Sequence, residues 1–433
     1  MIDRAIVKIW GLIVGAVLWN DDMQVASFEY DPKFVQKGYD LSPLKMPLQE
    51  SVIYNFPELR PKRTRAENTF NGLPGLLADT LPDRYGNRLI NTWLAQQGRP
   101  EDSMNPIEKL CFIGTRGMGA LEFEPATNKR IQSFDIIIDS LIEVATDMLN
   151  KREKFRANVQ KDELKAMQDI LTIGTSAGGA RAKAIIAYNE NTGEVKSGQT
   201  IAPKGFEHYL IKLDGVDDAQ FGTTKGYGRV EMAYYLMATA CGIDMMYSKL
   251  LEENGRAHFM TRRFDRENGD IKHHVQTLSA MQHYDYNEVG LYSYEQLFQT
   301  MRLLRLPYPQ AEQIFRRMVF NVIARNCDDH TKNFAFLLRQ EGDWEISPAY
   351  DICHAYRPGS DWVSKHALSL NGKREGITRE DFLVIAKSMN IKKPNIIIDE
   401  INSAVQDWDS YAKQAGVGEE LAISIGATLM DFA

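Results

Sequence analysis

The most constraining feature of this sequence is a long apolar helical pattern that runs directly into a polar segment. Between residues 309 and 326, apolar side chains recur at helical spacing over a wide face, which predicts a buried helix. The next residues, 327–334, read CDDHTKNF, and a second polar segment, SPAYDI at 347–352, follows a hairpin pattern centred on Gly342. We therefore expect a buried helix that delivers a polar loop at its C-terminal end.

Three side chains of these polar segments suggest a chemistry. Asp328 and Asn333 lie five positions apart, and a second acid, Asp351, follows the hairpin. Protein kinases use this layout, in which one carboxylate orients a hydroxyl while an Asn and a second carboxylate hold Mg²⁺ against phosphates. Taken alone, the spacing favours an ordinary polar turn, because Asp and Asn are common in turns. The rest of the chain decides between the two interpretations.

Composition narrows the class of protein. A chain of 433 residues predicts two or three subdomains, and its net charge of -7 argues against coating nucleic acid by bulk electrostatics. An apolar run at residues 9–19 is too short to span a bilayer. We expect a cytoplasmic protein without a membrane segment. The scattered cysteines are expected to be reduced thiols, not a zinc site or a disulfide framework: Cys111, Cys241, Cys327 and Cys353.

The N-terminal third predicts a β-rich module followed by helices. Alternating patterns predict strands at 5–10, 12–19 and 25–30, with a further candidate within 44–55. Residues 85–97 predict a helix, and 134–170 predict a helical region. Gly117 and Gly119 are interpreted as a tight turn that feeds a short strand, because no helix start follows them. The expected subdomains are 1–130, 131–265 and 266–433.

A small-residue loop and a strand lysine follow the helical region. The segment 176–183 reads SAGGARAK and runs into an apolar strand, so its backbone N–H groups could approach phosphate oxygens; a flexible surface turn is the alternative. Lys212 lies in the apolar strand 208–213, where it is interpreted either as a phosphate-neutralising lysine or as an edge-strand charge. The next predicted helix, 227–241, carries Glu231, which could hold Lys212.

Two predicted strands, 247–252 and 258–264, are joined by an Asn-Gly turn signal. The second ends in Arg262, Arg263 and Phe264, where the hinge of a kinase would present backbone groups to adenine. A charged strand end is an adequate alternative without the other motifs.

The order of these features favours a kinase. These features follow one another in the same order as in a eukaryotic-like kinase. They are a small-residue loop, a strand Lys, a helix Glu, a hinge, an Asp-x4-Asn loop after a buried helix, and a final Asp. The His-Arg-Asp motif of kinases is replaced by Asn-Cys-Asp at residues 326–328, and the Asp-Phe-Gly motif is replaced by Asp-Ile-Cys at residues 351–353. No Ala-Pro-Glu segment is visible. We expect an α+β protein with a divergent two-lobed eukaryotic-like protein kinase fold, an N-terminal β-rich subdomain and a mainly helical C-terminal lobe.

The same motifs resemble a known family. The stretches SAGGARAK at 176–183, RFDR at 263–266, CDDHTKNF at 327–334 and YDI at 350–352 resemble the HipA serine/threonine-protein kinase toxins of bacterial toxin–antitoxin modules. The resemblance implies a kinase that uses ATP and Mg²⁺, phosphorylates an aminoacyl-tRNA synthetase and so halts translation, which promotes persistence. It implies a HipB-like helix-turn-helix antitoxin as partner, with which the toxin co-represses its operon on operator DNA.

The resemblance also implies regulation by autophosphorylation. Ser176 matches the family's autophosphorylated serine by its spacing to Lys183, and Ala182 lies where some toxins carry an acid.

The candidate residues divide by role. Asp328 is the expected catalytic base, with Lys212 and Glu231 as the other catalytic residues, and Asn333 and Asp351 are expected to bind the metal. The residues expected to contact the nucleotide are Gly178, Gly179, Ala180, Arg181, Ala182, Lys183, Lys212, Arg262, Arg263, Phe264, His330, Thr331, Lys332, Asn333, Tyr350 and Asp351. Two alternatives stay open: a small-molecule or lipid kinase, and a non-catalytic regulator that binds antitoxin and DNA.

Overall fold

The computed structural model describes residues 2–62, 68–127, 135–150, 169–171, 174, 181–198, 201–218, 222–223 and 225–432. The chain forms two compact units. Unit 1 comprises Met1–Lys225 and Leu251–Val275, and unit 2 comprises Gly226–Leu250 and Gln276–Ala433. No helix among the described residues has the length and apolar character needed to cross a membrane.

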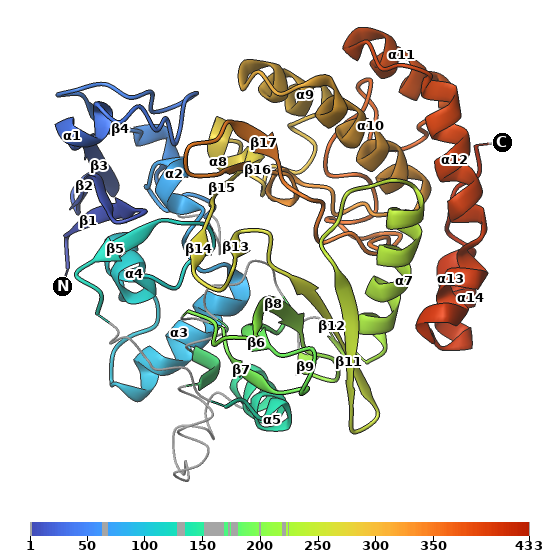
Figure 1. The fold of residues 1–433 in the computed structure, drawn as a ribbon, viewed down its shortest axis with the longest axis horizontal. Helices are drawn as coiled ribbons and strands as arrows, with labels where there is room; N and C mark the ends of the chain where they lie inside the picture. The colour runs from blue at the N-terminus through green and yellow to red at the C-terminus, as the bar shows by residue number, and fades with distance from the viewer. Residues whose placement is uncertain are drawn as a thin grey trace. The chain divides into compact units, whose positions relative to one another are not determined.

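Unit 1 begins with a five-stranded antiparallel sheet in the order β4-β3-β2-β1-β5 (Figure 1). Its strands are β1 (Arg4–Ile9), β2 (Leu12–Asn20), β3 (Val25–Tyr30), β4 (Ile53–Asn55) and β5 (Glu122–Glu124). Trp10 and Gly11 join β1 to β2 with φ angles of 49° and 77°, as in the two-residue turns that match strand twist. The sheet confirms the first three predicted strands and the turn after Asn20.

Short helices accompany this sheet in unit 1. They are α1 (Pro32–Val35), η1 (Pro57–Leu59), α2 (Gly75–Ala78), α3 (Arg84–Gln96) and α4 (Pro106–Ile113). The side chain of Asp83 accepts a hydrogen bond from the backbone of α3, and Asn105 does the same for α4. The helix predicted at 85–97 is thus confirmed, whereas α4 lies in a stretch for which no helix was predicted.

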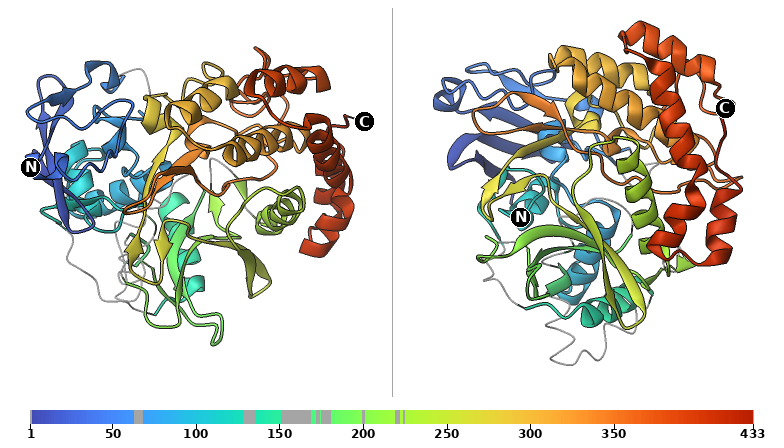
Figure 2. Two further views of the ribbon diagram at one scale, coloured as in Figure 1. Left: turned by 45° about the horizontal axis from the view of Figure 1, so that its top comes forward. Right: turned by 45° about the vertical axis from the view of Figure 1, so that its right-hand side comes forward.

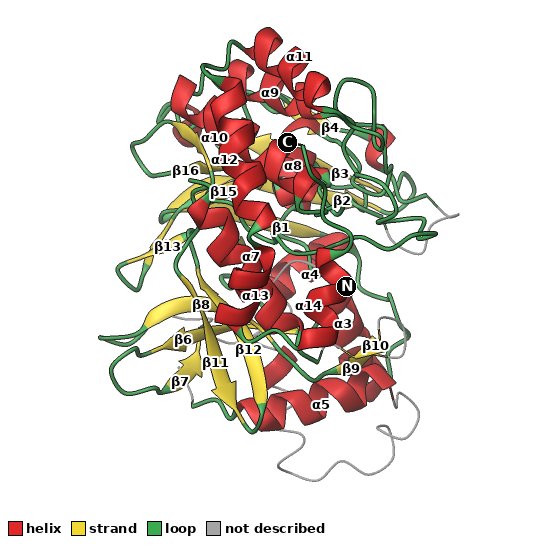
Figure 3. Ribbon diagram, turned by 90° about the vertical axis from the view of Figure 1, so that its right-hand side faces the viewer, coloured by secondary structure: helices red, strands yellow, loops and turns green. Residues whose placement is uncertain are grey.

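A second five-stranded sheet has the order β11-β12-β8-β6-β7 (Figure 3). Its strands are β6 (Lys183–Tyr188), β7 (Val195–Ser197), β8 (Glu207–Lys212), β11 (Ser248–Glu253) and β12 (Arg256–Arg262). Asn254 and Gly255 join β11 to β12 with φ angles of 47° and 76°, which confirms the hairpin that the Asn-Gly pair predicted. The shorter strands are β9 (Asp217–Asp218), β10 (Gly222–Thr223), β13 (Arg266–Glu267), β14 (Ile271–Lys272) and β15 (His274–Thr277).

One hydrophobic cluster joins this second sheet to two helices of unit 1. Tyr85 and Leu89 of α3 belong to the same buried cluster as Leu141 of α5 (Ile138–Asn150) and as Ile186 and Ile211 of the sheet. Period-two alternation brings Ile186 and Ile211 to one face, so the opposite face of the same strands stays available for polar chemistry. The predicted boundary near residue 130 stays a prediction.

Unit 2 is mainly helical. Its first helices are α7 (Tyr227–Ala240), α8 (Leu278–Gln282), α9 (Tyr294–Leu303) and α10 (Tyr308–Ile323). Ser293 and Gln296 form a capping box that fixes the start of α9. Helix α10 packs against α9, α11 and α12 (Figure 2), and its Phe315, Met318 and Val322 are fully buried. The buried helix predicted from the apolar pattern is thus confirmed.

The polar loop and a hairpin follow α10. The loop leads through the 3₁₀ helix η2 (Thr331–Asn333) to the antiparallel strands β16 (Ala335–Leu338) and β17 (Trp344–Ile346), as predicted. The remaining helices are α11 (Arg379–Met389), α12 (Pro394–Gln406), α13 (Trp408–Ala415) and α14 (Glu419–Gly426). They confirm the predicted helical tail, and α13 packs against α7.

Candidate active site

The loop after α10 is held by backbone hydrogen bonds on both sides of Asp328. Arg325 turns the chain with a φ of 56°, a conformation that ends the helix. Beyond it, the Cys327 N–H donates to the carbonyl of Ala355 at 3.0 Å, and the Cys327 carbonyl accepts from the Ala367 N–H at 3.1 Å. The loop therefore has a defined position within unit 2.

The Asp328 carboxylate lies in a partly buried polar and aromatic setting. Its side chain is 35% exposed, and its Oδ1 accepts a 2.7 Å hydrogen bond from Trp362 Nε1. His330 Nε2 is 3.8 Å from the same oxygen. Burial raises the pKa of Asp328 above its usual value and the negative charge of Asp351 adds to this, whereas His330 and the Trp362 hydrogen bond oppose the rise. This carboxylate is suited to accept a proton from a bound hydroxyl.

Asn333 and Asp351 present oxygen atoms near this carboxylate. Asn333 Nδ2 donates a 2.6 Å hydrogen bond to the carbonyl of Asp328, which leaves the amide oxygen of Asn333 for another partner. Asp351 is exposed and has a φ of 55°. Its segment is tied to the loop because the hydroxyl of Tyr350 donates to the carbonyl of Lys332 at 2.6 Å. Amide and carboxylate oxygens are the ligand type that Mg²⁺ prefers.

The other predicted residues of this loop differ in their surroundings. Thr331 is buried and donates to the carbonyl of Tyr284 at 3.3 Å. The ammonium of Lys332 lies 5.0 Å from the centre of the Tyr286 ring, a cation–π distance. The His330 ring lies 5.2 Å from the same ring. Lys332 and His330 are therefore positioned by Tyr286, a residue for which the sequence gave no signal.

A fully buried acid supports the loop from beneath. Asp329 is 0% exposed and accepts hydrogen bonds from Tyr294 at 2.7 Å, from the His366 ring at 3.0 Å and from the Ala367 N–H at 2.7 Å. Burial disfavours the charged form of His366, but the charge and hydrogen bond of Asp329 outweigh it and raise the pKa of His366 to about 10. Asp329 and His366 thus form a buried ion pair under the loop at residues 327–334.

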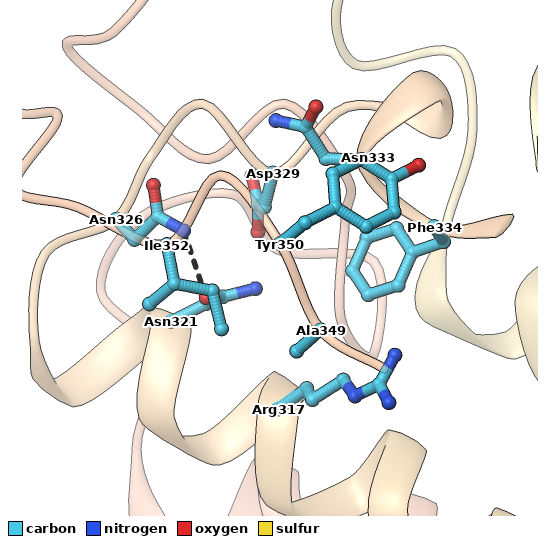
Figure 4. Close-up of a pocket in the computed structure, with 9 residues that line it drawn as sticks. All are labelled: Arg317, Asn321, Asn326, Asp329, Asn333, Phe334, Ala349, Tyr350 and Ile352. Carbon is cyan, nitrogen blue, oxygen red and sulfur yellow. Dashed lines mark hydrogen bonds between the residues drawn. The ribbon is translucent and has the colours of Figure 1, made fainter. Parts of the chain in front are cut away.

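A small cavity lies next to this ion pair. Figure 4 shows it between α10 and the segments 329–334 and 349–352. Asn321 and Asn326 line it and are joined by a 2.9 Å hydrogen bond, and Arg317 lines it and donates to the Ser347 carbonyl at 2.6 Å. Its volume of about 10 Å³ corresponds to about one water molecule, so it is an interior packing feature and not a nucleotide pocket.

Unit 1 holds the predicted strand lysine in the middle of its second sheet. Lys212 of β8 lies directly opposite Lys183 of β6 on one side and Phe259 of β12 on the other. Directly paired residues point to the same face of a sheet, so both ammonium groups share the face opposite the cluster of Ile186 and Ile211. The predicted lysine thus shares this face of the sheet with a second lysine, Lys183.

The strand end predicted to be a hinge contains a buried ionic network. Asp265 is 0% exposed and pairs with Arg263 at 2.6 Å and Arg266 at 2.8 Å, and it also accepts the N–H of Gly119 at 2.7 Å. Burial opposes the charge of Asp265, but the two arginines hold its pKa well below the usual range. Gly119 has a φ of +74°, which suits glycine, and Arg266 donates to the carbonyl of Gly117 at 2.9 Å. The turn at Gly117 and Gly119 is therefore held to the strand end by hydrogen bonds.

The remaining predicted residues have mixed outcomes. Ala182 is buried and its carbonyl accepts from the Leu213 N–H at 3.0 Å, and Arg262 lies 3.9 Å from Glu207. Glu231 is buried on α7 of unit 2, whereas Lys212 belongs to unit 1, so their pairing stays a prediction. Some predicted residues lie outside the described residues: Ser176, Gly178, Gly179 and Ala180.

Comparison with known protein families decides the relationship of the chain. Residues 175–408, more than half of the chain, match the HipA-like C-terminal domain, and residues 5–124 match the HipA N-terminal domain. The chain belongs to the HipA family.

Known proteins similar to this HipA family member extend the comparison. The HipA structure of Shewanella oneidensis MR-1, solved as a toxin–antitoxin complex with HipB and operator DNA, aligns with a TM-score of 0.67 at 16% identity. The alignment covers 98% of this chain and 94% of that one, and it shows a shared fold. Y4mE of Sinorhizobium fredii, a protein named as a candidate kinase, is 24% identical over 193 residues. That match covers 42% of this chain and 39% of the relative.

Sequence reasoning missed the residues that surround the predicted ones. Trp362 and Tyr286 lie in irregular segments without a periodic pattern, so no sequence signal marked them. His366 also lies outside any regular element. The adjacent acid Asp329 was a weak signal, since two neighbouring carboxylates in one loop need different partners. Only the fold brings these four side chains together.

Proposed function

We propose that this HipA family member is an ATP- and Mg²⁺-dependent protein kinase that phosphorylates serine or threonine. The observation that carries the proposal is the arrangement of Asp328, Asn333 and Asp351 in unit 2. Asn333 binds the backbone of Asp328, and the charge of Asp351 acts on the Asp328 carboxylate. One acid next to an amide and a second acid is the minimum set for phosphoryl transfer from a metal-bound nucleotide.

The roles of the residues follow from their surroundings. Asp328 accepts a hydrogen bond from the acceptor hydroxyl and takes its proton as the hydroxyl oxygen bonds to the γ-phosphorus of ATP. The bond from that phosphorus to the β–γ bridging oxygen breaks, and ADP leaves. Asn333 and Asp351 would hold Mg²⁺ through oxygen atoms. Lys212, held by Glu231, would neutralise phosphate charge, and Lys183 would contact the phosphates at the end of the small-residue loop. A bound Mg²⁺–ATP complex supplies the transferable γ-phosphoryl group. The described residues include no cluster of three or more His, Cys, Asp or Glu side chains of metal-binding geometry.

The proposal that this chain binds Mg²⁺ and ATP rests on the chemistry of its own residues. Two lysines lie at opposed positions on one face of a sheet, and an amide beside an acid offers hard oxygen ligands. Backbone groups at Arg262, Arg263 and Phe264 are proposed to contact adenine. The contacts of Asp265 with Arg263 and Arg266 support a rigid strand end for that role.

The biological role is proposed from the family. We infer a toxin that pairs with a HipB-like helix-turn-helix antitoxin and reaches operator DNA through it, because the HipA structure from Shewanella oneidensis is a complex of that composition. The protein substrate is proposed to be an aminoacyl-tRNA synthetase, the site of autophosphorylation Ser176, and the location the cytoplasm.

Transfer of labelled phosphate from γ-labelled ATP tests the activity. Purified protein is incubated with Mg²⁺, labelled ATP and a cell lysate, and the products are separated by gel and by thin-layer chromatography. A discrete labelled protein is expected, and Asp328→Asn should reduce the labelling by at least about a thousandfold, since the base and its charge are lost. Asp399→Asn, on the surface of unit 2, is the matched control and should keep full labelling.

Each outcome has a definite meaning. Label that appears only in a small molecule or a lipid would replace the protein kinase by the alternative kinase class. Labelling that survives in Asp328→Asn would refute the assignment of the base. Absence of Mg²⁺-dependent ATP binding in calorimetry would leave a non-catalytic regulator. Peptide mass spectrometry of Ser176→Ala beside the wild type tests the proposed autophosphorylation site.

A further inference from the structure

The two oxygens of the Asp328 carboxylate differ in their contacts. Trp362 donates its indole N–H to Oδ1 at 2.7 Å, and His330 Nε2 lies 3.8 Å from that same oxygen. Within the part of the chain that the structure describes, Oδ2 has neither a hydrogen bond nor an ion pair. One oxygen of the proposed base is therefore engaged, and the other is available to a substrate.

Trp362 is presented by a compact turn. The hydroxyl of Ser360 accepts hydrogen bonds from the N–H groups of Trp362 and Val363, each at 3.2 Å. The turn is closed by backbone bonds from Arg357 to the Val363 carbonyl at 3.2 Å and from Ser364 to the Ser360 carbonyl at 3.3 Å. The indole is thus attached to an ordered segment, and its contact with Asp328 is a feature of the fold.

The indole also belongs to an aromatic group around the base. The Trp362 ring lies 6.3 Å from Tyr286 and 6.3 Å from His330, both in edge-to-face orientation, and His330 lies 5.2 Å from Tyr286. Such pairs add attraction beyond the area that they bury. The rings of Tyr286 and His330 restrict the rotation of Trp362, so its N–H is aimed at Asp328.

We propose that Trp362 is a positioning residue for phosphoryl transfer, whose indole N–H holds Oδ1 of Asp328 so that Oδ2 faces the acceptor hydroxyl. This inference rests on the proposed kinase function and on Asp328 as the base. It assigns a role to the segment 357–365, which follows Asp351 and lies outside the motifs of the nucleotide site.

The physical reason lies in orientation. A carboxylate rotates freely unless one oxygen is fixed, and a misplaced base loses much of its effect on the rate. The indole N–H of Trp362 fixes Oδ1 of Asp328 at 2.7 Å, so the direction of Oδ2 is fixed as well.

Trp362→Phe tests the proposal, because it keeps an aromatic ring and removes the donor. We expect kcat for phosphorylation at neutral pH to fall by about tenfold or more, the loss typical of one hydrogen bond to a charged group. KM for ATP should stay within about twofold, so the loss should fall on kcat and not on nucleotide binding. Trp344→Phe in β17 is the matched control and should change none of these.

A second variant tests whether local unfolding, and not the loss of the hydrogen bond, explains a fall in kcat. Ser360→Ala keeps the indole but loosens the turn that carries it, so kcat should fall in the same direction by a smaller factor. Circular dichroism and thermal unfolding of each variant report its folding separately.

The outcomes separate the inference from the function beneath it. An inactive wild type, or an active Asp328→Asn, would overturn the kinase proposal itself. With an active, Asp328-dependent wild type, an unchanged kcat in Trp362→Phe would overturn only the role of Trp362. A rise in kcat would also overturn it, because the indole would then block the carboxylate. A fall in kcat with an equal rise of KM for ATP, or with a loss of thermal stability, would overturn the positioning role and make Trp362 a structural residue.

Discussion

Replacing Asp329 by Asn should destabilise unit 2 strongly and in a pH-dependent way. Asp329 has no exposed surface, and its carboxylate accepts hydrogen bonds from Tyr294, His366 and the backbone of Ala367. The variant keeps the size of the side chain and removes its charge. His366, which is 2% exposed, would then lose the counter-ion that favours its charged form.

The magnitude follows from the loss of that counter-ion. Removing one partner of a buried ion pair typically costs about 3–5 kcal/mol, because the remaining charge is uncompensated. The pKa of His366 gives a figure of the same order. Its folded value of about 10 lies above the value of about 6.5 for an unfolded histidine, a difference worth roughly 5 kcal/mol. We therefore expect Asp329→Asn to lower the free energy of unfolding by about 3–5 kcal/mol at pH 7.

The pH dependence has a definite sign. A histidine whose folded pKa is raised contributes its full stability below its unfolded pKa and loses it as the pH rises through the folded value. The contribution of His366 should thus be nearly complete at pH 7 and should decline toward pH 10. Because Asp329→Asn removes the cause of the raised pKa, wild type and variant should differ less at pH 9.5 than at pH 7.

Urea unfolding followed by circular dichroism at both pH values measures this difference. Asp399→Asn is the matched control: Asp399 pairs with Arg379 on the surface, where its side chain is 63% exposed, and its loss should cost no more than about 1 kcal/mol. His366→Gln and the double variant complete a cycle that isolates the coupling of the pair. A cost below about 1 kcal/mol for Asp329→Asn, or a difference that stays constant with pH, would refute the reasoning.

Two further predictions concern unit 1. Asp265→Asn should lower the free energy of unfolding by about 3–5 kcal/mol in urea, whereas Asp139→Asn, whose partner Arg256 is partly exposed, should cost at most about 1 kcal/mol; equal costs would contradict the buried network. Burial lowers the pKa of His258 to about 4, so its contribution is present above about pH 6.5 and is lost as the pH falls through 4. His258→Gln should therefore flatten the acid decline of the urea midpoint between pH 6.5 and 4.5, and an unchanged decline would exclude this histidine as a cause.

Local patterns in the sequence were sufficient for most of the elements. The apolar face of 309–326 predicted α10, and Asn254–Gly255 predicted the β11–β12 hairpin, because side-chain period and turn chemistry act over a few residues. Helix α4 was missed because it is short and begins with a proline after a polar stretch. Its start depends on Asn105, which also reaches the carbonyl of Ile2 at 2.8 Å, far away in the sequence.

Some residues of the candidate site could also be predicted from the sequence, and others could not. Asp328, Asn333 and Asp351 could be predicted because their types and order follow from phosphoryl-transfer chemistry. The pairing of Lys183 with Lys212 could not, because strand register depends on which face of the sheet is buried.

The sequence by itself determined which groups this chain brings to a reaction. It specified the residue types, their order and the elements that carry them, since these depend on local propensity and chemical role. Only the tertiary structure decided which oxygen of Asp328 stays available and which buried ion pair supports its loop. Trp362 and His366 come from irregular segments, and their distance from Asp328 and Asp329 is set by long-range packing and hydrogen bonds. Such contacts leave no period in the sequence, because they join residues that are neighbours only in the folded chain.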